Sequence, residues 1–148
     1  ERRLVNGLAV RLQSVRVGDR GGVLIIRDGD DKDVSCVVDL ARELARSAGE
    51  AGSATQVVIA APEFEAWILA SIDTVGAHRL VADSTPILDP EARRGAKERL
   101  RSAMTESYRE TIHQAAFTSL IDVELASARS RSFRRLVHAV EVLASGED

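Results

Sequence analysis

Cysteine is nearly absent from this sequence, which has a single one, Cys36, among 148 residues. One cysteine excludes an internal disulfide and any cysteine-based zinc site, and it is typical of a protein from a reducing cytoplasm. Long apolar runs are also absent, because no stretch approaches the roughly 20 residues that span a membrane. No signal peptide is visible, although the sequence starts at Glu1 without a methionine. We therefore expect a cytoplasmic protein with no membrane segment.

The chain also lacks an excess of positive charge. Its formal net charge of −3 argues against binding of nucleic acid by charge alone, because that mode requires a strongly basic surface. A metal-dependent enzyme acting on phosphodiesters is not excluded, since bound ions neutralise part of the repulsion. Two basic clusters either line a phosphate path or form solvated helix faces. They are Arg93, Arg94, Lys97, Arg99 and Arg101, and later Arg129, Arg131, Arg134 and Arg135.

The remaining composition is that of an ordinary globular domain. Apolar residues make up 45% of the chain and charged residues 29%, which fits neither a disordered nor a membrane protein. A chain of 148 residues is long enough to bury a continuous core. We therefore expect one globular domain.

The most informative segment is an apolar run that ends in a cluster of carboxylates. Residues 23–26 are apolar, three of them β-branched, and predict a strand buried on both faces, as in parallel sheets flanked by helices. Ligands bind beyond the carboxyl ends of such strands, where Asp28 and Asp30 follow. Two neighbouring carboxylates suit a hard cation such as Mg²⁺, which prefers oxygen ligands. The alternative is an Asp/Gly-rich turn whose side chains cap the next helix.

Helix and strand patterns alternate over the first half of the chain. Apolar spacing predicts amphipathic helices over 3–17 and 37–48, the second capped by Asp33 or Ser35. Residues 56–60 predict a second buried strand, so strand, helix and strand form a βαβ unit with a right-handed crossover. Because two strands do not make a stable sheet alone, we expect further strands before the first residue of this sequence.

The second half of the chain is predicted to be mainly helical. A helix is expected over 62–72, an irregular connection over 76–90, and a helix that starts at an Asp-Pro pair and covers about 90–108. Further apolar stripes predict helices to the end of the chain. We therefore expect an α/β fold with its core in residues 1–75, followed over 76–148 by the connection and a helical extension packed on the same domain.

A second pair of carboxylates, Glu63 and Glu65, follows the second predicted strand as Asp28 and Asp30 follow the first. In a parallel sheet both pairs lie at one edge, which favours a shared metal site. Residues two apart on a helix point about 200° apart, so only one of this pair faces the ion. We expect Glu63 to complete the site and Glu65 to be an outer or capping group. The alternative is that both acids merely complement the dipole of the helix that they begin.

Other candidates have a structural interpretation that competes with a functional one. Trp67, the single tryptophan, lies on an apolar helix face and is expected in the core. Cys36 could be a nucleophile near a helix N-terminus, but a small buried side chain is the expectation. Residues 127–132, with their serines and arginines, either bind phosphate at the start of the last helix or cap it, and we expect capping. No role is assigned to three residues without partners at a metal-ligand or triad spacing: Tyr108, His113 and His138.

Several of these motifs resemble the TOPRIM superfamily of topoisomerases, primases and OLD-type nucleases. The apolar strand followed by Asp28-Gly29-Asp30 resembles the second motif of that superfamily. Three further segments resemble an uncharacterised TOPRIM-like branch of bacterial proteins that are often encoded beside ATPases. They are Glu63-Phe64-Glu65-Ala66-Trp67, Tyr108-Arg109 and Ser130-Arg131-Ser132-Phe133.

The resemblance implies a Rossmann-like fold that binds Mg²⁺ or Mn²⁺ through acidic residues and cleaves or transfers phosphodiesters. It makes Asp28, Asp30 and Glu63 the expected catalytic residues, and the same three with Glu65 the expected metal ligands. TOPRIM proteins also carry a glutamate after their first strand, upstream of the Asp-x-Asp. No apolar strand precedes a glutamate in this sequence, which is a departure from the family pattern.

Two functional hypotheses follow from the sequence. The first is Mg²⁺-dependent cleavage of nucleic acid by a nuclease subunit that works with an ATPase, with arginines balancing the backbone charge. The second is a non-catalytic TOPRIM-like module that docks an ATPase or another protein, which the acidic charge and the missing glutamate favour. A haloacid-dehalogenase-type phosphohydrolase is disfavoured, because that family has Gly-Thr after its Asp-x-Asp where this chain has Asp31-Lys32. DNA or RNA as substrate, and the oligomeric state, stay open.

Overall fold

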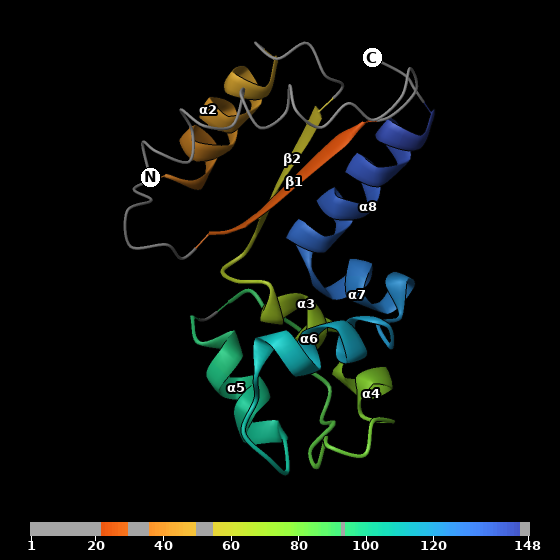
Figure 1. The fold of residues 1–148 in the computed structure, drawn as a ribbon. Helices are drawn as coiled ribbons and strands as arrows, with labels where there is room; N and C mark the ends of the chain where they lie inside the picture. The colour runs from red at the N-terminus through yellow and green to blue at the C-terminus, as the bar shows by residue number, and fades with distance from the viewer. Residues whose placement is uncertain (1–21, 30–35, 50–54, 93, 146–148) are drawn as a thin grey trace. The chain divides into compact units, whose positions relative to one another are not determined.

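The computed structural model describes residues 22–29, 36–49, 55–92 and 94–145. Its chain divides into two compact units. The first combines Glu1–Ile59 with Arg135–Asp148, and the second is Ala60–Arg134. Each unit is described by itself, and Figure 1 gives the labels of the helices and strands.

The first unit contains a βαβ element. Strand β1 (Val23–Asp28) and strand β2 (Thr55–Ala60) pair in a two-stranded parallel sheet, and helix α2 (Val37–Gly49) connects them. Leu40 and Leu44 lie one turn apart on α2, and both are buried with Ile59 of β2 in a small hydrophobic cluster. The apolar face of α2, with its spacing of four residues, therefore packs against the apolar strand β2, as the two patterns predict.

The C-terminal helix α8 (Arg131–Ser145) contributes its later turns to the first unit. Gly22, just before β1, lies so close to Leu143 that a Cβ on this glycine would clash with the leucine side chain. A larger residue at position 22 would therefore require the Leu143 side chain to shift. With α2 and α8, helices flank the sheet in this unit (Figure 1).

The α/β prediction is confirmed at this level, as a parallel sheet flanked by helices with a helix at the C-terminus. Strand β1, however, is not buried on both faces. Its first three residues are partly buried and Ile26 is 44% exposed. In the described part of the chain β1 pairs only with β2. The expected helix over 3–17 and the expected caps Asp33 and Ser35 lie outside the described residues.

The second unit is helical. Its helices are α3 (Glu65–Ala70), α4 (Ile72–Val75), α5 (Ala96–Ala103), α6 (Glu110–Thr118) and α7 (Val123–Arg129). Every residue of α3 is buried, and this helix packs against α4, α5 and α7. Apart from Glu65 at its start, α3 is apolar on all sides, so it forms the centre of the unit. The core around it includes Ile68, Leu100 and Phe117, each with no exposed surface.

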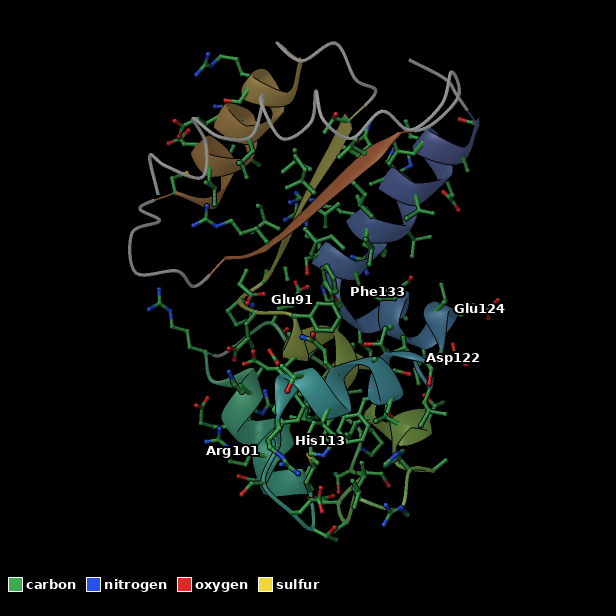
Figure 2. The ribbon with its side chains drawn as sticks, in the orientation of Figure 1. Glu91, Arg101, His113, Asp122, Glu124 and Phe133 are labelled. Atoms are coloured by element: carbon green, nitrogen blue, oxygen red, sulfur yellow. The ribbon has the colours of Figure 1, made fainter. Side chains whose placement is uncertain are left out.

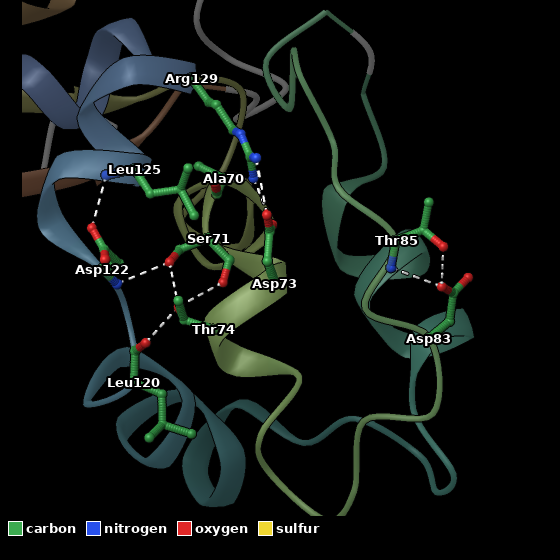
Figure 3. Close-up of polar contacts among 10 residues, drawn as sticks. All are labelled: Ala70, Ser71, Asp73, Thr74, Asp83, Thr85, Leu120, Asp122, Leu125 and Arg129. Atoms are coloured by element: carbon green, nitrogen blue, oxygen red, sulfur yellow. Dashed lines mark hydrogen bonds and ion pairs between the residues drawn. The ribbon is translucent and has the colours of Figure 1, made fainter.

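The helix expected over 62–72 is broken at Ser71. The Ser71 hydroxyl accepts a hydrogen bond from the Asp122 backbone at 2.8 Å and lies 2.6 Å from the Thr74 hydroxyl, which also donates to the carbonyls of Ser71 and Leu120 (Figure 3). Serine and threonine side chains that bond to nearby backbone compete with helix continuation. The segment therefore divides into α3 and α4, although its apolar period runs through the break.

The helix expected over 90–108 is wrong at both ends, because α5 covers only Ala96–Ala103. The connection over 76–90 contains no helix, as expected. After it, Gly95 adopts the left-handed conformation, with φ of 87°, before the helix starts. Glycine adopts this conformation without the steric penalty of other residues, so it is the local start point. Pro90 is buried instead of leading a helix, and Glu91 bonds elsewhere in the unit.

No helix in the described ranges is long and apolar enough to cross a membrane.

Candidate functional site

The four predicted site acids lie in different parts of the chain. Asp28 is the last residue of β1 and is exposed in the first unit. Asp30 lies outside the described residues. Glu63 and Glu65 belong to the second unit. The predicted convergence of these acids on one ion stays a prediction.

Glu63 caps the start of helix α5. Its side chain is 9% exposed, and its Oε1 accepts a hydrogen bond from the Lys97 backbone N–H at 2.8 Å. Lys97 is the second residue of α5, whose first N–H groups have no partner inside the helix. Gly95, which precedes the helix, has no side chain that could cap it. The carboxylate of Glu63 therefore supplies the cap from 34 residues away in sequence.

Glu65 is the more buried of the pair, with 3% of its surface exposed. Its Oε1 accepts a hydrogen bond of 2.9 Å from the Tyr108 hydroxyl, which is itself buried. The Tyr108 ring stacks on Phe117 with centroids 6.3 Å apart, and His113 lies against the same phenylalanine at 5.8 Å. One oxygen of each glutamate thus accepts a hydrogen bond within the unit, as is usual for buried carboxylates.

His113 is part of the same packing and has fixed hydrogen bonds. Its Nδ1 accepts from the Arg109 backbone N–H at 3.0 Å, so the ring proton lies on Nε2, 3.1 Å from the Glu106 carboxylate. No role could be predicted for His113 or Tyr108, because their partners are side chains and backbone groups that only the fold brings near. Both residues hold α6 against the core.

The cap formed by Glu63 makes a testable prediction. We expect Glu63→Ala to lower the free energy of unfolding by about 1 kcal/mol with a metal chelator present, because an N-cap contributes this much without any ion. Urea unfolding followed by the fluorescence of Trp67 measures it. Glu124→Ala is the matched control, since Glu124 is an exposed acid in the first turn of α7 that accepts no hydrogen bond from the described residues. A loss that appears only when Mg²⁺ is added would contradict the capping role.

A third glutamate, Glu91, stands at the centre of a hydrogen-bond network. Its Oε1 accepts from the Ser132 backbone N–H at 2.8 Å, from the Ser132 hydroxyl at 2.7 Å and from the Ser130 hydroxyl at 2.5 Å. The Ser132 oxygen in turn accepts from Trp67 Nε1 at 2.7 Å and from the Ala61 backbone N–H at 3.2 Å. One carboxylate therefore joins the connection before α5, the core helix α3 and the start of α8. Nothing in the local sequence around Glu91 indicates these partners.

This network settles the interpretation of the serine-rich segment. Ser130 caps α8 directly, because its hydroxyl accepts from the Phe133 backbone N–H at 3.0 Å. The Glu91 carboxylate accepts from the Ser132 backbone N–H, which is also in the first turn of α8. Figure 2 labels Glu91 and Phe133 at this place. The capping prediction for residues 127–132 is confirmed, since the chain's own carboxylate takes the place that a phosphate would need.

Hydrogen bonding keeps Glu91 ionised. Burial by itself raises the pKa of Glu91, but the hydrogen bonds from Ser130 and Ser132 together outweigh burial and hold the pKa below its ordinary value. The carboxylate is therefore negative at neutral pH and complements the positive end of α8.

The basic clusters divide into paired and exposed residues. Lys97 forms an ion pair with Glu110, and Arg129 forms a bidentate pair with Asp73 at 2.6 and 2.9 Å (Figure 3). The hydrogen bond from Arg129 lowers the pKa of Asp73. Arg93 lies outside the described residues, and the exposed members are Arg94, Arg101, Arg131, Arg134 and Arg135.

Two smaller predictions have clear outcomes. Trp67 is 1% exposed and packs edge-on against Phe133 at 5.8 Å, so its place in the core is confirmed. Cys36 is exposed, so the expectation of a buried thiol is wrong. The residue directly precedes α2, where the helix start faces solvent instead of the core.

Metal ligands in proteins come mainly from His, Cys, Asp and Glu side chains. In residues 22–29, 36–49, 55–92 and 94–145, no group of three or more His, Cys, Asp or Glu side chains could hold an ion. Asp28 still has the chemistry that suits Mg²⁺, because it is an exposed carboxylate at the carboxyl end of a parallel strand. Asp30 would be its partner, two residues on.

The comparisons give a family without an assigned activity. The family model described as "Domain of unknown function (DUF4276)" matches residues 6–141, so the chain belongs to that family. Neither the curated proteins nor the solved structures contain a significant match. The resemblance to TOPRIM proteins therefore stays a hypothesis.

Proposed function

We propose that this member of the DUF4276 family is a cytoplasmic nuclease subunit with a Rossmann-like, TOPRIM-type core that cleaves nucleic-acid phosphodiesters with Mg²⁺ or Mn²⁺. One observation carries the proposal: Asp28 ends β1, at the carboxyl edge of a parallel βαβ element. This edge is where ligands bind in open α/β sheets. An ATPase is the proposed partner protein.

In this proposal Asp28 and Asp30 hold the metal ion. The bound ion would polarise a phosphate oxygen and lower the pKa of an attacking water. Glu63 and Glu65 lie in the second unit, where each has one oxygen engaged, with the α5 backbone and with Tyr108. Exposed arginines such as Arg94 and Arg131 would balance the charge of the nucleic-acid backbone.

The test is cleavage of labelled DNA and RNA by the full-length protein with Mg²⁺ or Mn²⁺. We expect Asp28→Asn combined with Asp30→Asn to lower the rate at least about 100-fold, because the ion supplies most of the charge stabilisation. Asp39→Asn is the matched control, since Asp39 is an exposed aspartate of α2 in the same unit. We expect the control to keep its rate within about twofold.

Unchanged cleavage by the double variant would reject the metal site. Wild-type protein without activity on any substrate, alone or with its ATPase, would reject the nuclease.

A second function is favoured by a specific observation. Both glutamates of the Glu-x-Glu segment are buried and accept hydrogen bonds that stabilise the second unit. A non-catalytic module that has the same fold and docks an ATPase would retain both glutamates because they stabilise the second unit. Titration calorimetry separates the two functions. A docking module takes up no Mg²⁺ at about millimolar metal, whereas the nuclease binds the ion through its aspartates.

A further inference from the structure

A pocket of about 380 Å³ lies in the second unit, apart from the acids discussed above. Its floor is apolar and is formed by Leu69, Ile72 and Ile87, the outer side of the hydrophobic core. One wall is helix α5. The opposite wall is fixed to that helix, because the Asp83 backbone N–H donates to the Ala103 carbonyl at 3.1 Å. The pocket is therefore formed in advance, with a size typical of small-molecule sites.

Acceptors for hydrogen bonds lie at the rim of this pocket. Asp83 Oδ1 accepts from the Thr85 backbone N–H at 2.9 Å and from the Thr85 hydroxyl at 2.6 Å (Figure 3). The hydrogen bond from the Thr85 side chain is the main cause of a lowered pKa of Asp83, so its carboxylate is ionised at neutral pH. The carboxylate of Glu98, on α5, is a second lining group. An ionised carboxylate only accepts hydrogen bonds, so this rim selects ligand groups that donate.

A second hollow, of about 440 Å³, shares Arg99 with the first. Arg94 also lines it, and Asp89 is the acid among its lining residues. Two guanidinium groups against one carboxylate favour an anion here. Guanidinium groups bind phosphate in a planar, two-bond geometry. The shared Arg99 makes the two hollows neighbouring parts of one site.

We propose that these two hollows together bind a guanine nucleotide. The base covers the apolar floor, a carboxylate of Asp83 or Glu98 accepts from the adjacent N–H groups of its Watson–Crick edge, and the phosphate contacts Arg94 and Arg99. Adenine presents an acceptor nitrogen beside its amino group, and uracil flanks one N–H with two carbonyl oxygens. Both therefore meet a carboxylate less favourably than guanine does. The site does not depend on the proposed nuclease function.

Calorimetric titration of the full-length protein with guanosine monophosphate tests this inference. A chelator is present, so that failure of the metal site has no influence on the result. We expect a dissociation constant below about 1 mM. We also expect binding at least about tenfold tighter than that of adenosine monophosphate, uridine monophosphate or inorganic phosphate, because each loses charge-assisted hydrogen bonds.

Single variants test the phosphate contacts and the base contacts of the site separately. Arg94→Gln, at an exposed position before α5, should weaken the binding of guanosine monophosphate about tenfold. Arg101→Gln, at an exposed position on α5 outside the lining of both hollows, should change the affinity less than about twofold. Glu98→Gln should reduce the preference for guanine over adenine. Binding no tighter than that of inorganic phosphate, or an equal loss in Arg94→Gln and Arg101→Gln, would overturn the proposal.

Discussion

Replacing Glu91 by alanine is expected to lower the free energy of unfolding by about 3 kcal/mol. The change leaves one backbone N–H and two serine hydroxyls without the acceptor they share. Ser130 and Ser132 are both buried, so water does not readily replace the carboxylate. Leaving buried donors unpaired costs far more than the net gain of forming one hydrogen bond. Urea unfolding followed by Trp67 fluorescence measures the loss, since Trp67 donates to the same network.

Glu91→Gln separates charge from hydrogen bonding, and we expect it to lose less than Glu91→Ala at neutral pH. The folded-state pKa of Glu91 lies below its ordinary value of 4.5, so the ionised group stabilises the fold above that pH. The stabilisation decreases as the pH falls below about 4.5 toward the folded-state pKa. Glu91→Gln lacks this titration, so its stability should fall less steeply there. Equal stability of Glu91→Ala and wild type at pH 7 would show that the network contributes nothing.

Removing the Phe117 ring is expected to have the largest effect on stability, about 4 kcal/mol for Phe117→Ala. Phe117 has no exposed surface and contacts three rings, those of His78, Tyr108 and His113. Its loss removes the buried ring and also leaves a cavity that a stacked cluster cannot fill by small shifts.

Ile112→Ala is the matched control, because Ile112 lies on the same helix but is 52% exposed. We expect it to cost less than about 1 kcal/mol. Denaturant unfolding with the Trp67 signal compares the two variants. Comparable losses would mean that the rings around Phe117 do not form the core of the second unit.

Local patterns in the sequence predict the βαβ element well. Apolar runs give β1 and β2, and the spacing of Leu40 and Leu44 gives α2. Each of these signals depends on neighbours within one or two turns. The burial of β1 is less predictable, because it depends on which elements cover the faces of the sheet, and this is not a local property.

The errors in the second unit have one physical origin. An Asp-Pro pair before Glu91 is a typical helix start, but the Glu91 carboxylate pairs with serines 39 and 41 residues away. The α5 cap comes from Glu63, 34 residues away. Gly95, with its positive φ, directly precedes α5, and glycine adopts that conformation without the steric penalty of other residues. Side-chain partners at such separations are set by tertiary packing, which single-sequence patterns do not contain.

The candidate site shows the same division between local patterns and tertiary contacts. The Asp-x-Asp and Glu-x-Glu segments are found because each follows a strand. The hydrogen-bond partners of these carboxylates are known only from the three-dimensional structure. Glu63 and Glu65 have hydrogen-bond partners that the sequence does not indicate, and Asp28 ends its strand as predicted.

A crystal structure of the full-length protein grown with Mn²⁺ shows whether Asp28 and Asp30 hold a divalent ion. Anomalous scattering locates the ion independently of any activity. We expect an anomalous peak with an Asp28 carboxylate oxygen at about 2.0–2.4 Å, the range of hard cations on oxygen. Well-ordered Asp28 and Asp30 side chains with no ion between them would contradict it.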